Sequence, residues 1–276
     1  MLPALLSVAD FQRALNEAPI PLMVVDASYY LPHELKDASA LYREEQIPTA
    51  CFFDIEEVCD TTSLLPHMLP TPEQLERALQ SFGVTPDSWI VVYDQKGVFS
   101  SPRFWWMCHA LGWERVSVLD GGLPAWKAAG GAVVSQGQES SAKGSTLPLG
   151  LARCEAWVAT LPQVQSAIDD VQTCILDARG ADRFHGRVPE PRAGLKSGHI
   201  PSSCNVPYPE VLNPETGGYQ PLSVLEERLA DALTHPRVIT TCGSGVTACI
   251  LTLAFYLLGK HPLAVYDGSW AEYGQL

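Results

Sequence analysis

The stretch VITTCGSGVTACILTLAFYLLG, residues 238–259, decides the fold class of this chain. It begins with four β-branched residues, passes two closely spaced glycines, and continues as an apolar segment of helical length that ends at Gly259. A strand that runs directly into a helix is the unit of a parallel α/β sheet, in which ligands bind beyond the carboxyl ends of the strands. Cys242 follows the last residue of this predicted strand.

The residues around Cys242 favour a bound anion. Gly243 and Gly245 allow a tight turn that points backbone N–H groups inward, and the helix that follows presents its N-terminus to the same place. These donors would stabilise a Cys242 thiolate, a persulfide or a substrate anion.

A single cysteine is more often a small buried apolar residue, and we interpret six of the others in that way. These are Cys51, Cys108, Cys154, Cys174, Cys204 and Cys249. Cys59 lies in a polar loop, and its environment is left open.

The chain is an internal repeat. Four landmarks of the first half return in the second: LMVVDA (22–27) as CILDAR (174–179), QIPTACFFD (46–54) as HIPSSCNVP (199–207), IVVYD (90–94) as VITTC (238–242), and VSVLDGGLPAW (116–126) as LAVYDGSWAEY (263–273). The near-constant spacing predicts two homologous domains, residues 1–133 and 151–276. The Ser- and Gly-rich residues 134–150 between them are interpreted as a linker.

Each half alternates short β-branched runs with helical patterns, which predicts an α/β fold with a parallel sheet flanked by helices in each domain. The expected strands include 22–26, 89–94, 174–178, 237–241 and 262–267. The expected helices include 72–83 and 101–112, ending at Gly83 and Gly112, together with 226–233 and 246–259.

The first repeat has Asp94 where the second has Cys242. A carboxylate cannot carry a sulfane sulfur, so we expect only the second domain to be catalytic. Asp94 itself is interpreted as a capping or turn residue.

Composition excludes several functions. The 276 residues include 18 Lys or Arg and 31 Asp or Glu, a net charge of -13 that disfavours nucleic acid as a partner. No apolar run approaches the roughly 20 residues of a membrane span. The N-terminus does not resemble a secretory signal, so we expect a cytoplasmic protein with reduced cysteines. The spacing of the cysteines and histidines predicts no metal site.

Five basic residues gather in one segment of the second half, namely Arg179, Arg183, Arg187, Arg192 and Lys196. A local cationic patch on an acidic protein suits a small anionic substrate, but a solvated loop with surface ion pairs would give the same pattern.

Together these motifs resemble the rhodanese superfamily. The six-residue loop CGSGVT (242–247), DGSWAEYG (267–274) and GHIP (198–201) are similar to motifs of that family. The loop resembles most closely that of the 3-mercaptopyruvate sulfurtransferases, as do FFDIEEVCDTTSLLPHMLP (52–70), RFWWM (103–107) and RFHGRVPEPR (183–192). The resemblance covers almost the whole chain.

This resemblance implies a sulfurtransferase without a cofactor. Cys242 would accept sulfur from 3-mercaptopyruvate as a persulfide, release pyruvate and pass the sulfur to a thiol such as thioredoxin, or to cyanide. Arg183 and Arg192 would hold the substrate carboxylate and carbonyl. The rest of the substrate site would be the loop residues Gly243, Gly245, Val246 and Thr247. Because a tandem repeat can form its own domain interface, we expect a monomer.

The resemblance also implies an acid–base group of Asp54, His67 and Ser244. Each has an ordinary alternative: Ser244 as a helix N-terminal hydroxyl bonded to backbone, and the other two as a loop pair of the non-catalytic half. The chain departs from the family at Ser202, where a glycine is usual, and at Gln46, where a histidine is usual. It also ends five or six residues after DGSW, without the usual extended tail.

Three other functions share parts of this pattern. A thiosulfate:cyanide sulfurtransferase would gain from cations inside the loop, and the loop has none. A cysteine phosphatase needs an arginine six residues after the cysteine, where Ala248 stands. A persulfide carrier without turnover would use the same half-reactions, and the sequence leaves it open.

Overall fold

The computed structural model describes residues 2–135 and 144–276, so the predicted linker 134–150 lies partly outside the described residues. The contacts of the chain divide it into two compact units. Unit 1 contains Met1–Cys59, Pro70–Arg153 and Pro214–Gly218, and unit 2 contains Asp60–Leu69, Cys154–Asn213 and Tyr219–Leu276. Each half of the sequence therefore contributes one short segment to the other unit. None of the described helices is long and apolar enough to cross a membrane.

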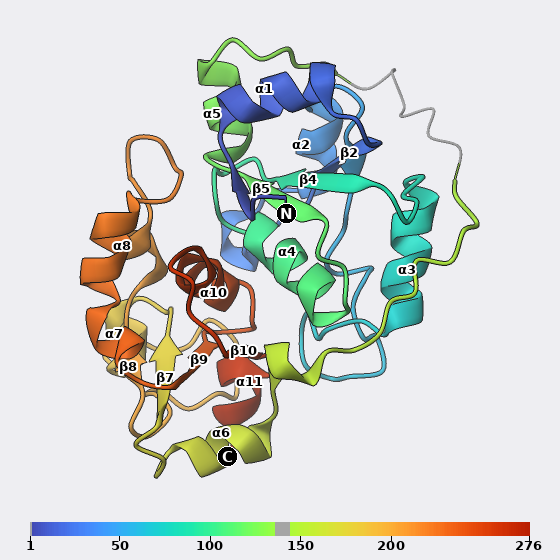
Figure 1. Cartoon of the computed structure of the whole chain (residues 1–276). Helices are drawn as coiled ribbons and strands as arrows, with labels where there is room; N and C mark the ends of the chain where they lie inside the picture. The colour runs from blue at the N-terminus through green and yellow to red at the C-terminus, as the bar shows by residue number, and fades with distance from the viewer. Residues whose placement is uncertain (1, 136–143) are drawn as a thin grey trace. The chain divides into compact units, whose positions relative to one another are not determined.

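Unit 1 is built on a parallel five-stranded sheet with the order β1-β5-β4-β2-β3 (Figure 1). Its strands are β1 (Leu5–Leu6), β2 (Leu22–Asp26), β3 (Cys51–Phe52), β4 (Trp89–Tyr93) and β5 (Val116–Leu119). Its helices are α1 (Val8–Glu17), α2 (Ala38–Glu44), α3 (Pro72–Ser81), α4 (Ser101–Ala110) and α5 (Gly122–Ala128), with a 3₁₀ turn at Pro32–Glu34.

Unit 2 repeats this sheet with the order β6-β10-β9-β7-β8, again all parallel. Its strands are β6 (Val158–Ala159), β7 (Thr173–Asp177), β8 (Cys204–Asn205), β9 (Arg237–Thr241) and β10 (Leu263–Tyr266). Its helices are α6 (Leu161–Ala167), α7 (Ala181–Phe184), α8 (Leu222–Arg228), α9 (Ala230–Leu233), α10 (Ala248–Leu257) and α11 (Ser269–Tyr273), with 3₁₀ turns at Glu155–Trp157 and Tyr208–Val211. The predicted α/β repeat is thus confirmed.

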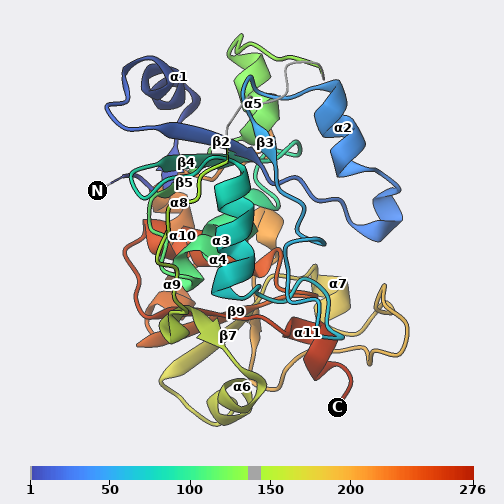
Figure 2. The same ribbon diagram turned by 90° about the vertical axis from the view of Figure 1, so that its right-hand side faces the viewer.

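The central strands β4 and β9 lead into the most buried helices of their units, α4 and α10. Every residue of α4 is buried, as are the eight residues Ala248–Phe255 of α10. Helix α10 packs on β9 and β10, and α6 packs on β7 (Figure 2). Helices without a polar face must be covered on all sides, so the end of each central strand is held between rigid, buried elements.

Local sequence signals set the ends of several elements. In α3, the Thr71 hydroxyl accepts from the Gln74 N–H, and the Gln74 side chain accepts from the Thr71 N–H, which makes a capping box. Gly83 and Gly112 follow α3 and α4 with φ of 85° and 84°. Both are left-handed positions, where glycine carries no steric cost, and the predicted helix ends are confirmed there.

Two expectations are wrong. The predicted helix 226–233 is two short helices, α8 and α9, which meet at Leu229. Cys204 is exposed rather than buried, because β8 is a two-residue strand at the sheet edge, and Cys154 is half-buried in the segment that enters unit 2.

No disulfide joins any of the eight cysteines, all of which are described. Cys59, which the sequence left open, is buried.

The two IP motifs are followed by the same kind of turn. Thr49 and Ser202 follow the proline of IP in the two repeats, and their φ values are 68° and 59°. The turn therefore keeps its left-handed residue without glycine, at a cost of about 1 kcal/mol at each position. Gln46 is buried and exchanges backbone hydrogen bonds with Val134, so it holds the described start of the linker to unit 1.

Candidate active site

Cys242 lies at the carboxyl end of the central strand β9 in unit 2, as predicted, and is 2% exposed. The DGSW motif holds its backbone. The Trp270 N–H donates to the Cys242 carbonyl at 3.0 Å, and the Ala271 N–H donates to the Gly243 carbonyl at 2.9 Å. The Cys242 N–H donates to the Ser269 hydroxyl at 3.3 Å. The first two carbonyls of the loop are therefore engaged by α11.

The loop from Cys242 to the start of α10 leaves backbone donors available. Within the described chain, the N–H groups of Gly243, Ser244, Val246 and Thr247 donate no hydrogen bond. Gly245 has a φ of 77°, so a side chain there would be strained. Unpaired N–H groups at the entry of a helix are where an anion binds.

The first repeat shows what such a loop holds. Asp94 follows β4 at the position of Cys242, and its Oδ2 accepts from the N–H groups of Phe99, Ser100 and Ser101 at 2.8–3.0 Å. The Ser101 hydroxyl adds a fourth hydrogen bond at 2.7 Å. The predicted turn-capping role of Asp94 is confirmed. A carboxylate fills the cradle of unit 1, whereas unit 2 has a cysteine at the same position.

Arg183 is brought to the catalytic loop. It lies on α7, and a Cβ placed on Gly243 would lie 3.1 Å from its Nη2. Its side chain is 28% exposed, so part of the guanidinium remains accessible. Arg192 is half-buried in the turn after Pro191 and makes no ion pair with any described residue. No hydrogen bond in the described chain joins Arg192 to Cys242, and the substrate role of Arg192 stays a prediction.

The five basic residues of this segment do not form one patch. Arg179 is buried and bonded to Asp177, Arg187 pairs with Asp182 at 3.1 Å, and Lys196 donates to the Leu276 carbonyl at 2.5 Å. The explanation by ion pairs therefore applies to most of these residues, and the binding of an anionic substrate stays a prediction. Some of these residues form ion pairs or backbone bonds, and Arg183 faces the loop.

Ser244 is 6% exposed, and its hydroxyl makes no hydrogen bond within the described chain. The alternative in which it bonds to helix backbone is therefore wrong. His67 belongs to unit 2 although it lies in the first half of the sequence. Its segment is fixed by the Leu69 N–H, which donates to the Asp267 carboxylate at 2.7 Å beside the DGSW helix. His67 is 5% exposed and has a φ of 59°.

Asp54 belongs to unit 1. Its Oδ1 accepts from the Glu56 N–H at 2.8 Å and caps the turn that follows β3. His67 and Ser244 belong to the unit of Cys242, and the acid–base role of all three residues stays a prediction.

Two of the other cysteines are poor nucleophiles. Burial raises the pKa of the Cys174 thiol to about 12, and it raises the pKa of the Cys108 thiol further. Neither follows a strand end with open backbone donors.

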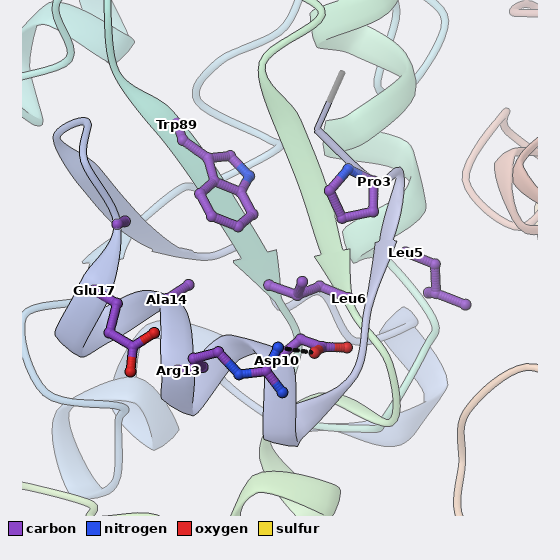
Figure 3. A pocket seen from close by; sticks show the side chains of 9 residues that line it. Pro3, Leu5, Leu6, Asp10, Arg13, Ala14, Glu17 and Trp89 are labelled. Atoms are coloured by element: carbon purple, nitrogen blue, oxygen red, sulfur yellow. Dashed lines mark ion pairs between the residues drawn. The ribbon is translucent and has the colours of Figure 1, made fainter.

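A hollow of about 350 Å³ in unit 1 is lined by Leu5, Leu6, Ala14 and Trp89, with Asp10, Arg13 and Glu17 at its rim (Figure 3). The hollow spans the length of the sheet, because Trp89 is the first residue of β4 whereas Leu6 pairs with Leu119, the last residue of β5. No predicted site residue lines it.

Two carboxylates beside the arginines were not predicted from the sequence. Glu190 is buried between Arg179 and Arg183, and Asp177 faces Arg179 from the end of β7. Both carboxylates were in quoted motifs, CILDAR and RFHGRVPEPR. An acidic residue between closely spaced arginines was the signal that could have identified Glu190.

Comparison with known proteins finds similarity over most of the chain. The rhodanese-like domain family matches residues 7–129 and 160–276. The chain is 38% identical to 3-mercaptopyruvate sulfurtransferase of Homo sapiens over 273 residues, 96% of this chain and 89% of the human protein. It is also 38% identical to the mitochondrial thiosulfate/3-mercaptopyruvate sulfurtransferase 1 of Arabidopsis thaliana over 276 residues, 91% of this chain and 71% of that protein.

Among solved structures, SseA from Escherichia coli is described as a 3-mercaptopyruvate sulfotransferase of the rhodanese fold. It matches with a TM-score of 0.83 at 32% identity, covering 98% of this chain and all of that one. Tum1 from Saccharomyces cerevisiae matches with a TM-score of 0.90 at 30% identity, covering 99% of this chain and 95% of that one.

Proposed function

The chain belongs to the rhodanese family, and from that premise we propose that it transfers sulfur from 3-mercaptopyruvate through a persulfide on Cys242. One observation carries the proposal. The loop after Cys242 leaves four backbone N–H groups without partners in the described chain, at the position where a carboxylate fills the loop of the first repeat. Such a loop favours a thiolate or persulfide over a neutral group.

The first half-reaction begins with attack of the Cys242 thiolate on the sulfur of 3-mercaptopyruvate. The new S–S bond forms as the C–S bond breaks, and the C–S electron pair leaves with the three-carbon fragment as the enolate of pyruvate. One proton converts the enolate to pyruvate. Arg183 donates hydrogen bonds to the donor's oxygens and stabilises the charge that develops there. We expect the Ser244 hydroxyl to donate to the same oxygens.

In the second half-reaction an acceptor thiolate attacks the outer sulfur, which restores the Cys242 thiolate and carries the sulfur away as a persulfide of the acceptor. Cyanide removes the same sulfur as thiocyanate. We expect the acceptor to be a small thiol or a dithiol protein of the thioredoxin type, and we expect the enzyme to work in the cytoplasm as a monomer.

Turnover of two cysteine variants tests the proposal. Cys242→Ser should abolish pyruvate release from 3-mercaptopyruvate, because a hydroxyl is far less acidic than a thiol and cannot hold a labile sulfur. Cys249→Ser is the matched control. Cys249 lies on α10, the helix that follows the loop, and is buried. Its thiol donates a hydrogen bond to the Gly245 carbonyl at 3.1 Å, and a serine hydroxyl can make the same bond. Activity in the first variant, or its loss in both, would contradict the proposal.

A further inference from the structure

Glu190 is a buried carboxylate that contacts two arginines beside the catalytic loop. Its side chain is 2% exposed. Its Oε1 accepts from Arg179 Nη1 at 2.8 Å, and its Oε2 accepts from Arg183 Nη2 at 2.5 Å. A longer contact of 3.3 Å joins Arg183 Nε to Oε1. Glu190 therefore holds the Arg183 guanidinium from the side that faces the protein interior.

Arg179 does not need Glu190 to balance its charge. Asp177 already accepts two hydrogen bonds from Arg179 Nε, at 3.0 and 3.2 Å, and one from Nη2 at 2.7 Å. Arg179 also donates to the Gly198 carbonyl and stacks over the Trp270 ring at 4.4 Å. The two arginines and two carboxylates form a network with no net charge, and the carboxylate of Glu190 is the one left to neutralise Arg183.

This neutralisation takes place at the catalytic loop. Arg183 Nη2, the nitrogen bonded to Glu190, is also the atom that lies 3.1 Å from a Cβ built on Gly243. A sulfur donor over the loop meets the N–H groups of Arg183 with a buried negative charge directly behind them. Because that charge is shielded from water, salt screens it weakly.

We propose that Glu190 determines donor specificity by cancelling the positive charge of Arg183, so that the site suits a carboxylate monoanion better than a compact dianion such as thiosulfate. This inference rests on the proposed function, since it takes sulfur donors to bind beside Cys242. Arg183 with its charge neutralised keeps the directional hydrogen bonds that a carboxylate uses. It loses the net positive charge, from which a dianion would gain twice as much binding energy as a monoanion.

The size of the effect follows from Coulomb's law. At an effective dielectric constant of about 20 and a separation of about 10 Å, one unit charge changes the binding of another by roughly 10-fold. Removing the Glu190 charge should therefore raise the ratio of kcat/KM for thiosulfate to that for 3-mercaptopyruvate on the order of 10-fold.

The test measures both donors with cyanide as the common acceptor. Glu190→Gln removes the charge and nearly preserves the shape, and Glu190→Asp keeps the charge but withdraws it from Arg183. Asp182→Asn is the matched control, because Asp182 lies in the same segment, pairs with Arg187 at 3.1 Å, and has a side chain that is 67% exposed. It changes the net charge of the protein by the same amount in a place that solvent screens.

We expect the donor ratio to rise on the order of 10-fold in Glu190→Gln and to stay within about 2-fold of wild type in the other two variants. An unchanged donor ratio in folded Glu190→Gln would overturn the inference, because the charge of Glu190 would then have no effect. An equal rise in Glu190→Asp would also overturn it, because the ratio would then depend on the position of the carboxylate and not on its charge. Failure of the proposed function is separately visible, since wild type would then form no thiocyanate from 3-mercaptopyruvate.

If Glu190→Gln does not fold, wild type supplies the measurement. Sulfate, a dianion, and pyruvate, a carboxylate monoanion, are compared as competitive inhibitors against 3-mercaptopyruvate. Neutralisation of Arg183 by Glu190 predicts weaker inhibition by sulfate than by pyruvate, and stronger inhibition by sulfate would overturn the inference.

Discussion

Replacing Asp26 with asparagine should stabilise unit 1 at neutral pH, whereas the same change at Asp177 should destabilise unit 2. The two residues occupy equivalent positions at the ends of β2 and β7. Asp177 faces the Arg179 guanidinium at 2.7 Å, but the first repeat has Ser28 where the second has Arg179. The repeats thus contain the same buried carboxylate with and without a countercharge.

Asp26 is fully buried, and its partners are neutral. Its Oδ1 accepts from the Ser28 N–H at 2.9 Å and from the Ser28 hydroxyl, and its Oδ2 accepts from the Gln95 amide at 3.2 Å. Burial raises the pKa of Asp26 from 3.8 to about 6, and these hydrogen bonds offset only part of that effect.

The sign of the pH dependence follows from this raised pKa. Between about pH 4 and pH 6 the folded state keeps a proton on Asp26 that the unfolded state releases, so the free energy of unfolding falls as pH rises through this window. Above it, ionised Asp26 costs roughly 3 kcal/mol. Asparagine carries no charge and removes that cost. The gain is reduced by any hydrogen-bond energy that the Gln95 amide loses when it faces a second amide. At Asp177, asparagine leaves the buried Arg179 short of a countercharge, a loss of roughly 3 kcal/mol or more.

Hydrogen exchange resolves the two units. Exchange of peptides that cover β2 and β4 should slow in Asp26→Asn at pH 7.5 relative to wild type, and the difference should shrink toward pH 4.5. Peptides that cover β7 and β9 should exchange faster in Asp177→Asn. The reasoning is refuted if Asp26→Asn destabilises unit 1 at pH 7.5 as Asp177→Asn does unit 2, or if its advantage does not depend on pH.

Three further variants test other parts of the account. Asp94→Ala should lower the free energy of unfolding of unit 1 by roughly 3 kcal/mol or more, because four buried donors lose their acceptor. The same exchange experiment measures this change, and a change below about 1 kcal/mol would show that the Asp94 carboxylate does not hold the loop. Arg192→Ala should reduce kcat/KM for 3-mercaptopyruvate by about 10- to 100-fold and affect thiosulfate less, and equal losses for both donors would mean that Arg192 supplies only general charge. Thr241→Val should raise stability by about 1 kcal/mol in thermal unfolding with activity retained, because the Thr241 hydroxyl is buried without a hydrogen bond in the described chain; a lower melting temperature would show that the hydroxyl has a stabilising partner.

The repeated strands, the place of Cys242 at the carboxyl end of a strand and the contrast with Asp94 could be predicted from the sequence. These features depend on local patterns, namely β-branched runs, a glycine turn and a following helix, and on spacing that repeats along the chain. The close approach of Arg183 to Gly243 was expected only from resemblance, since nothing in a linear pattern fixes which side chains of α7 reach the loop after β9.

Features that depend on tertiary contacts could not be predicted in the same way. The segment Asp60–Leu69 joins unit 2 through the hydrogen bond between Leu69 and Asp267, which lie far apart in the sequence. The exposure of Cys204 follows from its place on a short edge strand, and the length of that strand is not visible in the sequence. The sequence did not distinguish a cationic patch from a segment of ion pairs, because a linear pattern shows charge but not the buried carboxylates that neutralise it.

Intact mass spectrometry after incubation with 3-mercaptopyruvate and removal of excess donor tests the central claim most directly. The account predicts that wild type gains one sulfur, about 32 Da, and that dithiothreitol removes it, since thiolates attack an accessible sulfane sulfur. Cys242→Ser should show no gain, and Cys249→Ser should gain the same mass as wild type. An adduct that persists in Cys242→Ser, or no adduct on wild type while pyruvate is released, would contradict a persulfide on Cys242.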